Sequence, residues 1–162
     1  MHEDRLEALL LSYERYYNVN RDTPVSPFNA EALFSLHDEQ YVLVRKAKIS
    51  EADISEVVFF ALRDHLSLEE YTSLEEKAWE EGLSRVVLTD NHKSTDILLI
   101  LLTDSMDPEA KKAIKKSRRY KSYCFSLKGW SHYRTIACEF STGELVYNRQ
   151  GKILEKTLRN IL

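Results

Sequence analysis

Residues 97–102 read Ile-Leu-Leu-Ile-Leu-Leu, and residues 57–62 read Val-Val-Phe-Phe-Ala-Leu. Each run is continuously apolar, which is typical of a strand covered on both faces. Six residues are far too few to cross a bilayer as a helix, which needs about 20. The two runs therefore predict buried strands, and we place the strand at 97–102 in the centre of a sheet.

Amphipathic helices are expected at both ends of the chain. Leu and Tyr residues recur at steps of three and four over residues 3–17, which predicts a helix with one apolar stripe. Residues 18–27 contain Asn, Asp, Ser and two Pro and predict a loop, so the first helix is interpreted as a loosely attached arm. Residues 153–162 predict a final helix whose apolar end docks on the domain.

Two further helices are predicted between the strands. Ser67 and Glu70 have the spacing of a capping box, in which each side chain satisfies a backbone N–H at the helix start. Gly82 is interpreted as the left-handed residue that ends this helix. Asp107 and Pro108 predict the start of the next helix, because Asp is a common cap and Pro suits the first turn.

The remaining apolar stretches predict short strands separated by turns. These strands are expected at residues 32–36, 41–49, 57–62, 97–102, 123–128, 133–140 and 144–147. Runs of strands between helices favour an α+β fold. We expect a single domain over residues 1–162, with a central, mainly antiparallel sheet of about six strands and the order helix, three strands, helix, strand, helix, three strands, helix.

Positive charge is concentrated in one segment. Between Ala110 and Cys138 there are nine Lys and Arg residues and no Asp or Glu. The whole chain has a formal charge of -3, so the other residues together carry -12. Such segregation attracts an anionic partner or an acidic surface on a second copy of the chain. The candidate partner- or phosphate-binding residues are Lys112, Lys115, Lys116, Arg118, Arg119, Lys121, Trp130, Tyr133 and Arg134.

Three interpretations of this segment are open. The cations can bind nucleic-acid phosphates while Tyr120, Trp130 or Tyr133 stacks on bases, although the pI of about 6.0 is far below that of dedicated binding domains. The segment can instead pair with residues 51–81 of a second copy, which contain ten acidic and two basic residues. Both surfaces can also simply keep a monomer soluble.

The sequence contains no strong catalytic or metal-binding motif. Its element order is that of a common nuclease core, but such a core needs an acid-x-Lys triplet on a strand. Here the acid-x-Lys triplets are 75–77 and 109–111, both on predicted helices. The histidines have no helical pair spacing, and there is no Cys-x-x-Cys. We therefore predict no catalytic residues, no metal and no cofactor, and keep a degenerate nuclease relative as an alternative.

The predicted location is the cytoplasm. The acidic start Met1-His2-Glu3-Asp4 is unlike a secretory signal, and no apolar run predicts a membrane partner. Cys124 and Cys138 are expected to be reduced thiols, the first pointing outward and the second inward.

Several short stretches resemble those of a known group of proteins. They are Lys46-Ala-Lys-Ile-Ser-Glu-Ala, Ala110-Lys-Lys-Ala-Ile-Lys-Lys, Tyr120-Lys-Ser-Tyr, Gly129-Trp-Ser, Ser141-Thr-Gly-Glu and Asn148-Arg-Gln-Gly-Lys. The sequence is similar to a small family of bacterial cytoplasmic proteins of unassigned function. This resemblance implies a bacterial source and a stand-alone domain, and it implies no catalytic residues. The chain is thus interpreted as a non-catalytic binding or assembly module with acidic and basic faces, acting as a homodimer or on nucleic acid.

Overall fold

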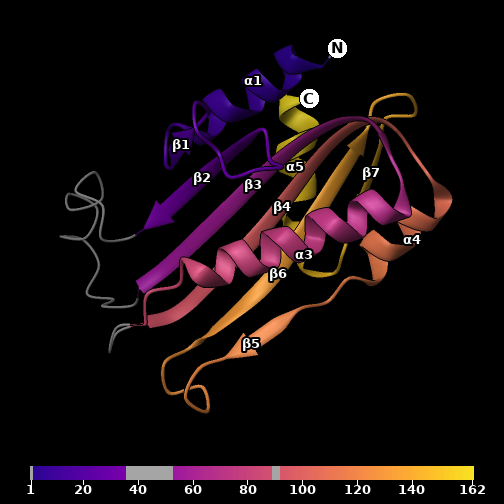
Figure 1. Ribbon diagram of the computed structural model, residues 1–162. Coiled ribbons are helices and arrows are strands. Elements are labelled where there is room, and N and C mark those ends of the chain that lie inside the picture. The colour runs from indigo at the N-terminus through magenta and orange to yellow at the C-terminus, as the bar shows by residue number, and fades with distance from the viewer. Residues whose placement is uncertain (1, 36–52, 89–91) are drawn as a thin grey trace.

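The computed structural model describes residues 2–35, 53–88 and 92–162 and shows one α+β domain built on an open mixed sheet (Figure 1). The strand predicted at 41–49 lies outside these residues. Along the chain the elements are α1 (Glu3–Tyr13), β1 (Asn18–Asn20), β2 (Ala30–Ser35), β3 (Asp53–Leu66), α3 (Leu68–Ser84), β4 (His92–Met106), α4 (Pro108–Lys116), β5 (Tyr120–Ser122), β6 (Trp130–Glu139), β7 (Glu144–Tyr147), the 3₁₀ helix η2 (Gln150–Leu154) and α5 (Glu155–Ile161).

The strands lie in the order β1-β2-β3-β4-β6-β5, and β7 pairs with the other end of β6. The outer pairings, β1 with β2, β2 with β3, β5 with β6 and β6 with β7, are antiparallel as expected. The two central pairings, β3 with β4 and β4 with β6, are parallel. The reason is that the chain returns along the sheet before each of these strands, through α3 before β4 and through α4, residues 117–119 and β5 before β6.

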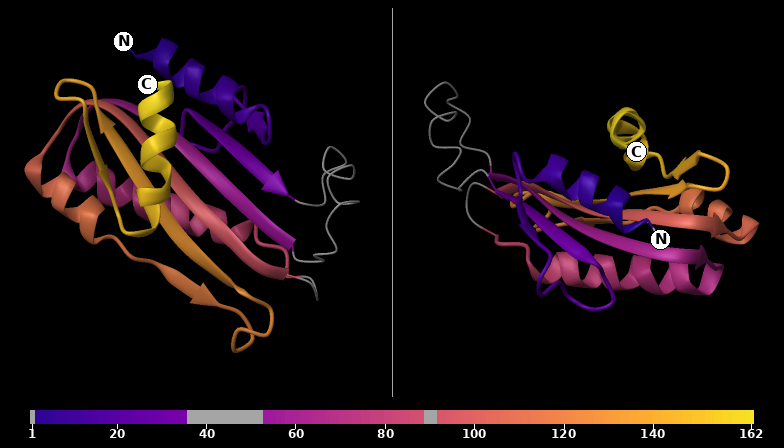
Figure 2. Two further views of the ribbon diagram at one scale, coloured as in Figure 1. Left: turned by 180° about the vertical axis from the view of Figure 1, so that it is seen from behind. Right: turned by 90° about the horizontal axis from the view of Figure 1, so that it is seen from above.

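The apolar run at 97–102 lies in the middle of β4, which confirms its central placement. Its odd-numbered side chains pack in a core with α3 and α4, and its even-numbered ones pack in a second core with α1 and α5. Figure 2 shows α3 on one side of the sheet and α1 and α5 on the other. No residue of the run is more than 1% exposed, so the strand is covered on both faces.

The first helix differs from the prediction in length and in attachment. It ends at Tyr13 rather than at residue 17, and β1 occupies part of the stretch expected to be a loop. Leu9 is 0% exposed and Leu10 3% exposed in the core that covers one face of the sheet. The helix is therefore a packed layer of the domain and not a loose arm.

The predicted helix ends are right at one position and wrong at another. Ser67 caps α3 as expected, and its hydroxyl accepts the backbone N–H of Glu70 at 3.2 Å. Gly82, however, lies inside α3 and faces the sheet. A Cβ there would come within 2.6 Å of a methyl carbon of Ile97, so this residue is small because the helix lies close to β4.

Residues 123–128 do not form the predicted strand. They form the loop between β5 and β6, and Cys124, Phe125 and Ser126 have the left-handed φ values 50°, 54° and 70°. The alternation of apolar residues is therefore not that of a half-buried strand. Cys124 is exposed and Cys138 is buried, as expected, and both thiols are free.

Candidate binding surface

Five exposed cations lie on α4 and on the segment that follows it. These residues, here termed the basic edge, are Lys112, Lys115, Lys116, Arg118 and Lys121. Buried Ala110 and Ile114 hold α4 against the core, which leaves its lysines on the solvent side. Figure 1 shows the chain continuing from α4 into β5, the outermost strand of the sheet at this end. The basic edge is therefore held by a helix and by an edge strand.

The basic edge is not neutralised within the part of the chain that the structure describes, where none of its five cations takes part in a salt bridge. An exposed group of like charges of this kind can attract phosphate, carboxylate or sulfate groups of a partner. Its chemistry is that of anion binding rather than of bond breaking.

Other cations of the same sequence segment are neutralised. Lys111 Nζ lies 2.7 Å from a carboxylate oxygen of Glu139 and 2.7 Å from one of Glu144. These contacts raise the pKa of the lysine and, despite burial, lower that of Glu139. The lysine is therefore committed to the fold rather than available to a partner.

Arg119 is also paired within the molecule, at 3.7 Å from Glu75 of the acidic helix α3. The hydroxyl of Ser117 donates to the same carboxylate. The predicted field of nine cations is thus divided, because the fold brings carboxylates from α3, β6 and β7 against part of it.

The candidate residues of β6 do not all join the basic edge, although Trp130 is in register with Ser122, the neighbour of Lys121. Tyr133 is 0% exposed, with its hydroxyl 3.4 Å from that of Tyr71, so the prediction that it stacks on a base is wrong. Burial raises the pKa of Tyr133 well above its usual value. Trp130 is 37% exposed, and alternation along β6 places it and Arg134 on the face opposite Tyr133.

Arg134 belongs to a partly buried charged cluster that the sequence did not reveal. It lies 3.3 Å from Asp96 of β4, and Asp96 is directly opposite Glu56 of β3 in the sheet register. The hydroxyl of Tyr17 donates to Glu56. Burial raises the pKa of both carboxyl groups. Within the described residues no three His, Cys, Asp or Glu side chains are grouped to hold a metal ion.

Two apolar side chains project from the loop between β5 and β6. Phe125 is 99% exposed and Leu127 is 83% exposed, and together they are here termed the loop tip. Sequence reasoning missed them because Tyr123, Phe125 and Leu127 alternate as strand residues do. Gly129, with φ 85°, ends this loop.

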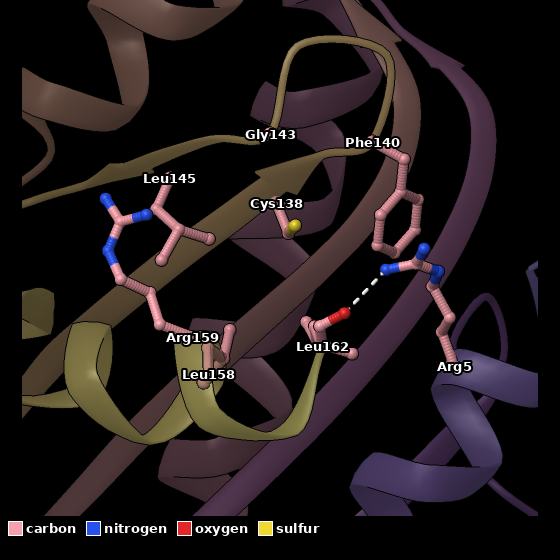
Figure 3. Close-up of a pocket in the computed structure, with 8 residues that line it drawn as sticks. All are labelled: Arg5, Cys138, Phe140, Gly143, Leu145, Leu158, Arg159 and Leu162. Carbon is pink, nitrogen blue, oxygen red and sulfur yellow. Dashed lines mark hydrogen bonds between the residues drawn. The ribbon is translucent and has the colours of Figure 1, made fainter.

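A pocket of about 450 Å³ opens elsewhere, where α1, α5 and the β6–β7 turn meet (Figure 3). Arg5 lines it, but its guanidinium donates to the Leu162 carbonyl at 2.7 Å and lies 4.7 Å from the centre of the Phe140 ring. Arg159 is paired with Glu155 at 3.0 Å. Both cations that line the pocket therefore already have partners, whereas the cations of the basic edge have no carboxylate partner among the described residues.

The family to which this chain belongs is decided by a match over almost its whole length. The chain is a member of the family described as Domain of unknown function (DUF8052), whose model matches residues 1–160. No curated protein and no solved structure matches it. The prediction of a family without an assigned function is confirmed.

The basic edge, the loop tip and the charged cluster of β3, β4 and β6 all lie within the residues that match the DUF8052 model. No helix in the described ranges of this DUF8052 domain is long and apolar enough to cross a membrane.

Proposed function

We propose that this DUF8052 protein is a non-catalytic binding module of the bacterial cytoplasm that holds an anionic partner against its basic edge. The observation that carries the proposal is the contrast between two sets of cations in one segment. Lys111, Arg119 and Arg134 are paired with carboxylates of the same molecule, whereas the five of the basic edge are exposed and have no such pairing among the described residues. Charges that the fold does not use are available to a partner.

A polyanion tests this proposal directly, and heparin is a suitable one. The variant Lys112→Glu/Lys115→Glu/Lys116→Glu removes most of the charge of α4. Its matched control is Arg149→Glu/Lys152→Glu/Lys156→Glu, which changes the net charge equally at exposed positions around η2 and α5.

Wild type is expected to be retained on immobilised heparin at low salt and to elute as salt rises, because binding releases counterions. The α4 variant should elute without retention, while the control should stay close to wild type. Wild-type protein that is not retained, or two variants that weaken retention equally, would show that the basic edge is not a binding surface.

A homodimer is a second candidate, and the placement of α3 beside α4 favours it. The two helices pack against one core, and the Arg119–Glu75 pair links the segment after α4 to α3. The exposed face of α3 carries acidic side chains, among them Glu69, Glu76 and Glu80. A two-fold axis between the helices would place each acidic surface on the basic edge of the other copy. Each exposed pair contributes about 0–1 kcal/mol, so such a dimer would be weak and sensitive to salt.

Nucleic acid is the alternative anionic partner. Tyr120 is 53% exposed and Trp130 is 37% exposed, so both rings can reach an unpaired base, whereas Tyr133 cannot. Gel-shift titrations with single-stranded and duplex DNA and RNA at low salt separate this possibility from a general affinity for polyanions. Binding that the α4 variant abolishes would identify nucleic acid as the partner.

A further inference from the structure

The loop tip presents more apolar surface to solvent than its place in the fold requires. Phe125 is 99% exposed and Leu127 is 83% exposed, so neither contributes to either core. Two large apolar side chains exposed in one short hairpin loop are unlike the single exposed apolar residues that are normal on protein surfaces. No other described residue covers them, so both side chains are available to a partner.

The loop is held in the conformation that projects them. Its base is fixed by Tyr123, which is 8% exposed and whose hydroxyl lies 2.9 Å from that of Ser131. The ring of His92 lies edge-on to Tyr123 at 5.7 Å, and its Nδ1 lies 2.5 Å from the Lys128 carbonyl oxygen. The order of the loop base means that little conformational entropy is lost when the tip is buried.

The backbone of the loop is strained at the tip itself. Three consecutive residues that are not glycine, Cys124 to Ser126, have positive φ values. A left-handed conformation costs about 1–2 kcal/mol for each such residue. Backbone strain of this kind is concentrated at functional positions, where the gain in binding compensates for it.

The side chains around the tip form a sequence of layers. The apolar pair lies in the loop, half-exposed Trp130 lies on the first rung of the hairpin opposite Ser122, and exposed Lys121 and Tyr120 lie one and two rungs farther from the loop. Apolar side chains that enter the acyl region, lysines at the level of the headgroups and aromatic rings at the interface are the arrangement by which proteins attach to a bilayer surface. Nucleic acid would use the lysines and rings, but it takes up a projecting apolar side chain only where neighbouring bases are unstacked, at a cost in energy.

We propose that the β5–β6 loop anchors this protein to an anionic lipid bilayer by inserting Phe125 and Leu127. The basic edge then contacts the anionic headgroups, so this inference rests on the function proposed above and names its partner. The sequence argued against a membrane partner because no segment is long enough to span one. A loop that inserts two side chains needs no such segment.

Sedimentation with lipid vesicles tests the proposal. Wild-type protein should sediment with vesicles of phosphatidylcholine and phosphatidylglycerol and not with vesicles of phosphatidylcholine alone. Phe125→Ser/Leu127→Ser should reduce vesicle binding about a hundredfold, because burial of each of the two side chains is worth about a factor of ten. Its stability and its retention on heparin should be those of wild type, because both side chains are exposed.

The control replaces an exposed apolar pair elsewhere, Leu11 on α1 and Ile153 on η2, which are 53% and 68% exposed. Leu11→Ser/Ile153→Ser should bind vesicles as wild type does. A second readout needs no variant: Cys124 is exposed at the tip and Cys138 is buried. Anionic vesicles should therefore slow the reaction of Cys124 with a water-soluble thiol reagent.

The outcomes separate this inference from the proposed function. Retention on heparin without vesicle binding would overturn the membrane anchor and leave the basic edge as a binding surface for another anion. Binding to nucleic acid but not to vesicles would identify a different partner and overturn the anchor in the same way. Vesicle binding that is equal in wild type and in the tip variant would also overturn it. Wild-type protein that binds neither heparin nor vesicles would overturn both proposals.

Discussion

Gly151 lies directly against the backbone of Thr135. A Cβ at position 151 would be 2.1 Å from the Thr135 carbonyl oxygen, which is far closer than a carbon and an oxygen that are not bonded to each other approach. The N–H of Gly151 donates to the side-chain oxygen of Asn148 at 2.8 Å, and that oxygen also accepts the Thr135 N–H at 3.1 Å. The side chain of Asn148 thus occupies the gap on β6 between β5 and β7, and Gly151 is the residue that lets the following turn approach.

Replacement of this glycine should destabilise the fold through steric overlap. We expect Gly151→Ala to lower the free energy of unfolding by about 3 kcal/mol or more, the upper end of the cost of overpacking, because a backbone atom has to move. Gly143→Ala is the control. Gly143 has φ +72° and nothing within 4 Å of its Cβ position, so only its left-handed conformation matters, at about 1–2 kcal/mol. Equal losses in urea denaturation would contradict the steric explanation.

Loss of the Glu139 charge should be costly near neutral pH. Its carboxylate is 3% exposed and accepts from the Met106 N–H at 2.8 Å, from Lys111 and from Thr142. These partners hold the pKa of Glu139 below its usual value. The stabilisation is therefore present above the unfolded-state pKa of about 4.3 and is lost as pH falls through the folded-state pKa.

We expect Glu139→Gln to lower the free energy of unfolding by about 1–3 kcal/mol at neutral pH, and the difference from wild type to shrink in acid. Glu144→Gln is the matched control, because this carboxylate meets the same lysine but its side chain is 41% exposed. It should cost less than about 1 kcal/mol. Denaturation curves across a pH series measure both, and a difference that grows in acid would contradict the assignment.

Glu56 should show the opposite dependence on pH. Burial raises its pKa, the nearby Asp96 carboxylate adds to this effect, and the Tyr17 hydroxyl and Arg134 oppose it. The folded state then holds its proton to a higher pH than the unfolded state does, so this group reduces stability as pH rises from about 4.3 through the folded-state pKa. We expect Glu56→Gln to gain stability relative to wild type over that rise. A variant that loses stability relative to wild type as pH rises would refute this account.

A homodimer that forms through α3 and α4 should be lost when the charge of one surface is reversed, and it should be restored when variants of opposite charge are mixed. Lys112→Glu/Lys115→Glu/Lys116→Glu makes both surfaces acidic, and Glu69→Lys/Glu76→Lys/Glu80→Lys makes both basic. Neither variant should dimerise alone, whereas an equal mixture should, because each acidic surface again meets a basic one. Sedimentation equilibrium at low salt measures the masses. Wild type that stays monomeric at high concentration would exclude the dimer.

The features that could be predicted from sequence are those that a local pattern encodes. The run at 97–102, the cap at Ser67 and the strand at 144–147 each have a signal within a few residues, and each is found where expected. The α+β class follows from their order. The parallel pairing of β3 with β4 and of β4 with β6 was missed, although continuous apolar runs such as 97–102 are typical of parallel strands that helices cover on both faces.

The residues whose roles were predicted wrongly are those whose environment is set by contacts distant in sequence. Gly82 resembles a helix terminator, and only the closeness of Ile97 shows why it is a glycine. Phe125 resembles a strand residue until the loop between β5 and β6 is seen to project it into solvent. The division of the basic segment depends likewise on carboxylates such as Glu75 and Glu139, which the fold brings from other elements.

Because the side chains of β4 point alternately into two cores, the two layers of the domain should unfold together. Neighbouring residues of 97–102 belong to opposite layers, so neither layer can melt while the other keeps its central strand. Heating or denaturant should therefore produce a single concerted transition in which loss of helix signal and exposure of buried tyrosines coincide. In hydrogen exchange, the amides of this strand should be among the last to open, at the free energy of the whole molecule.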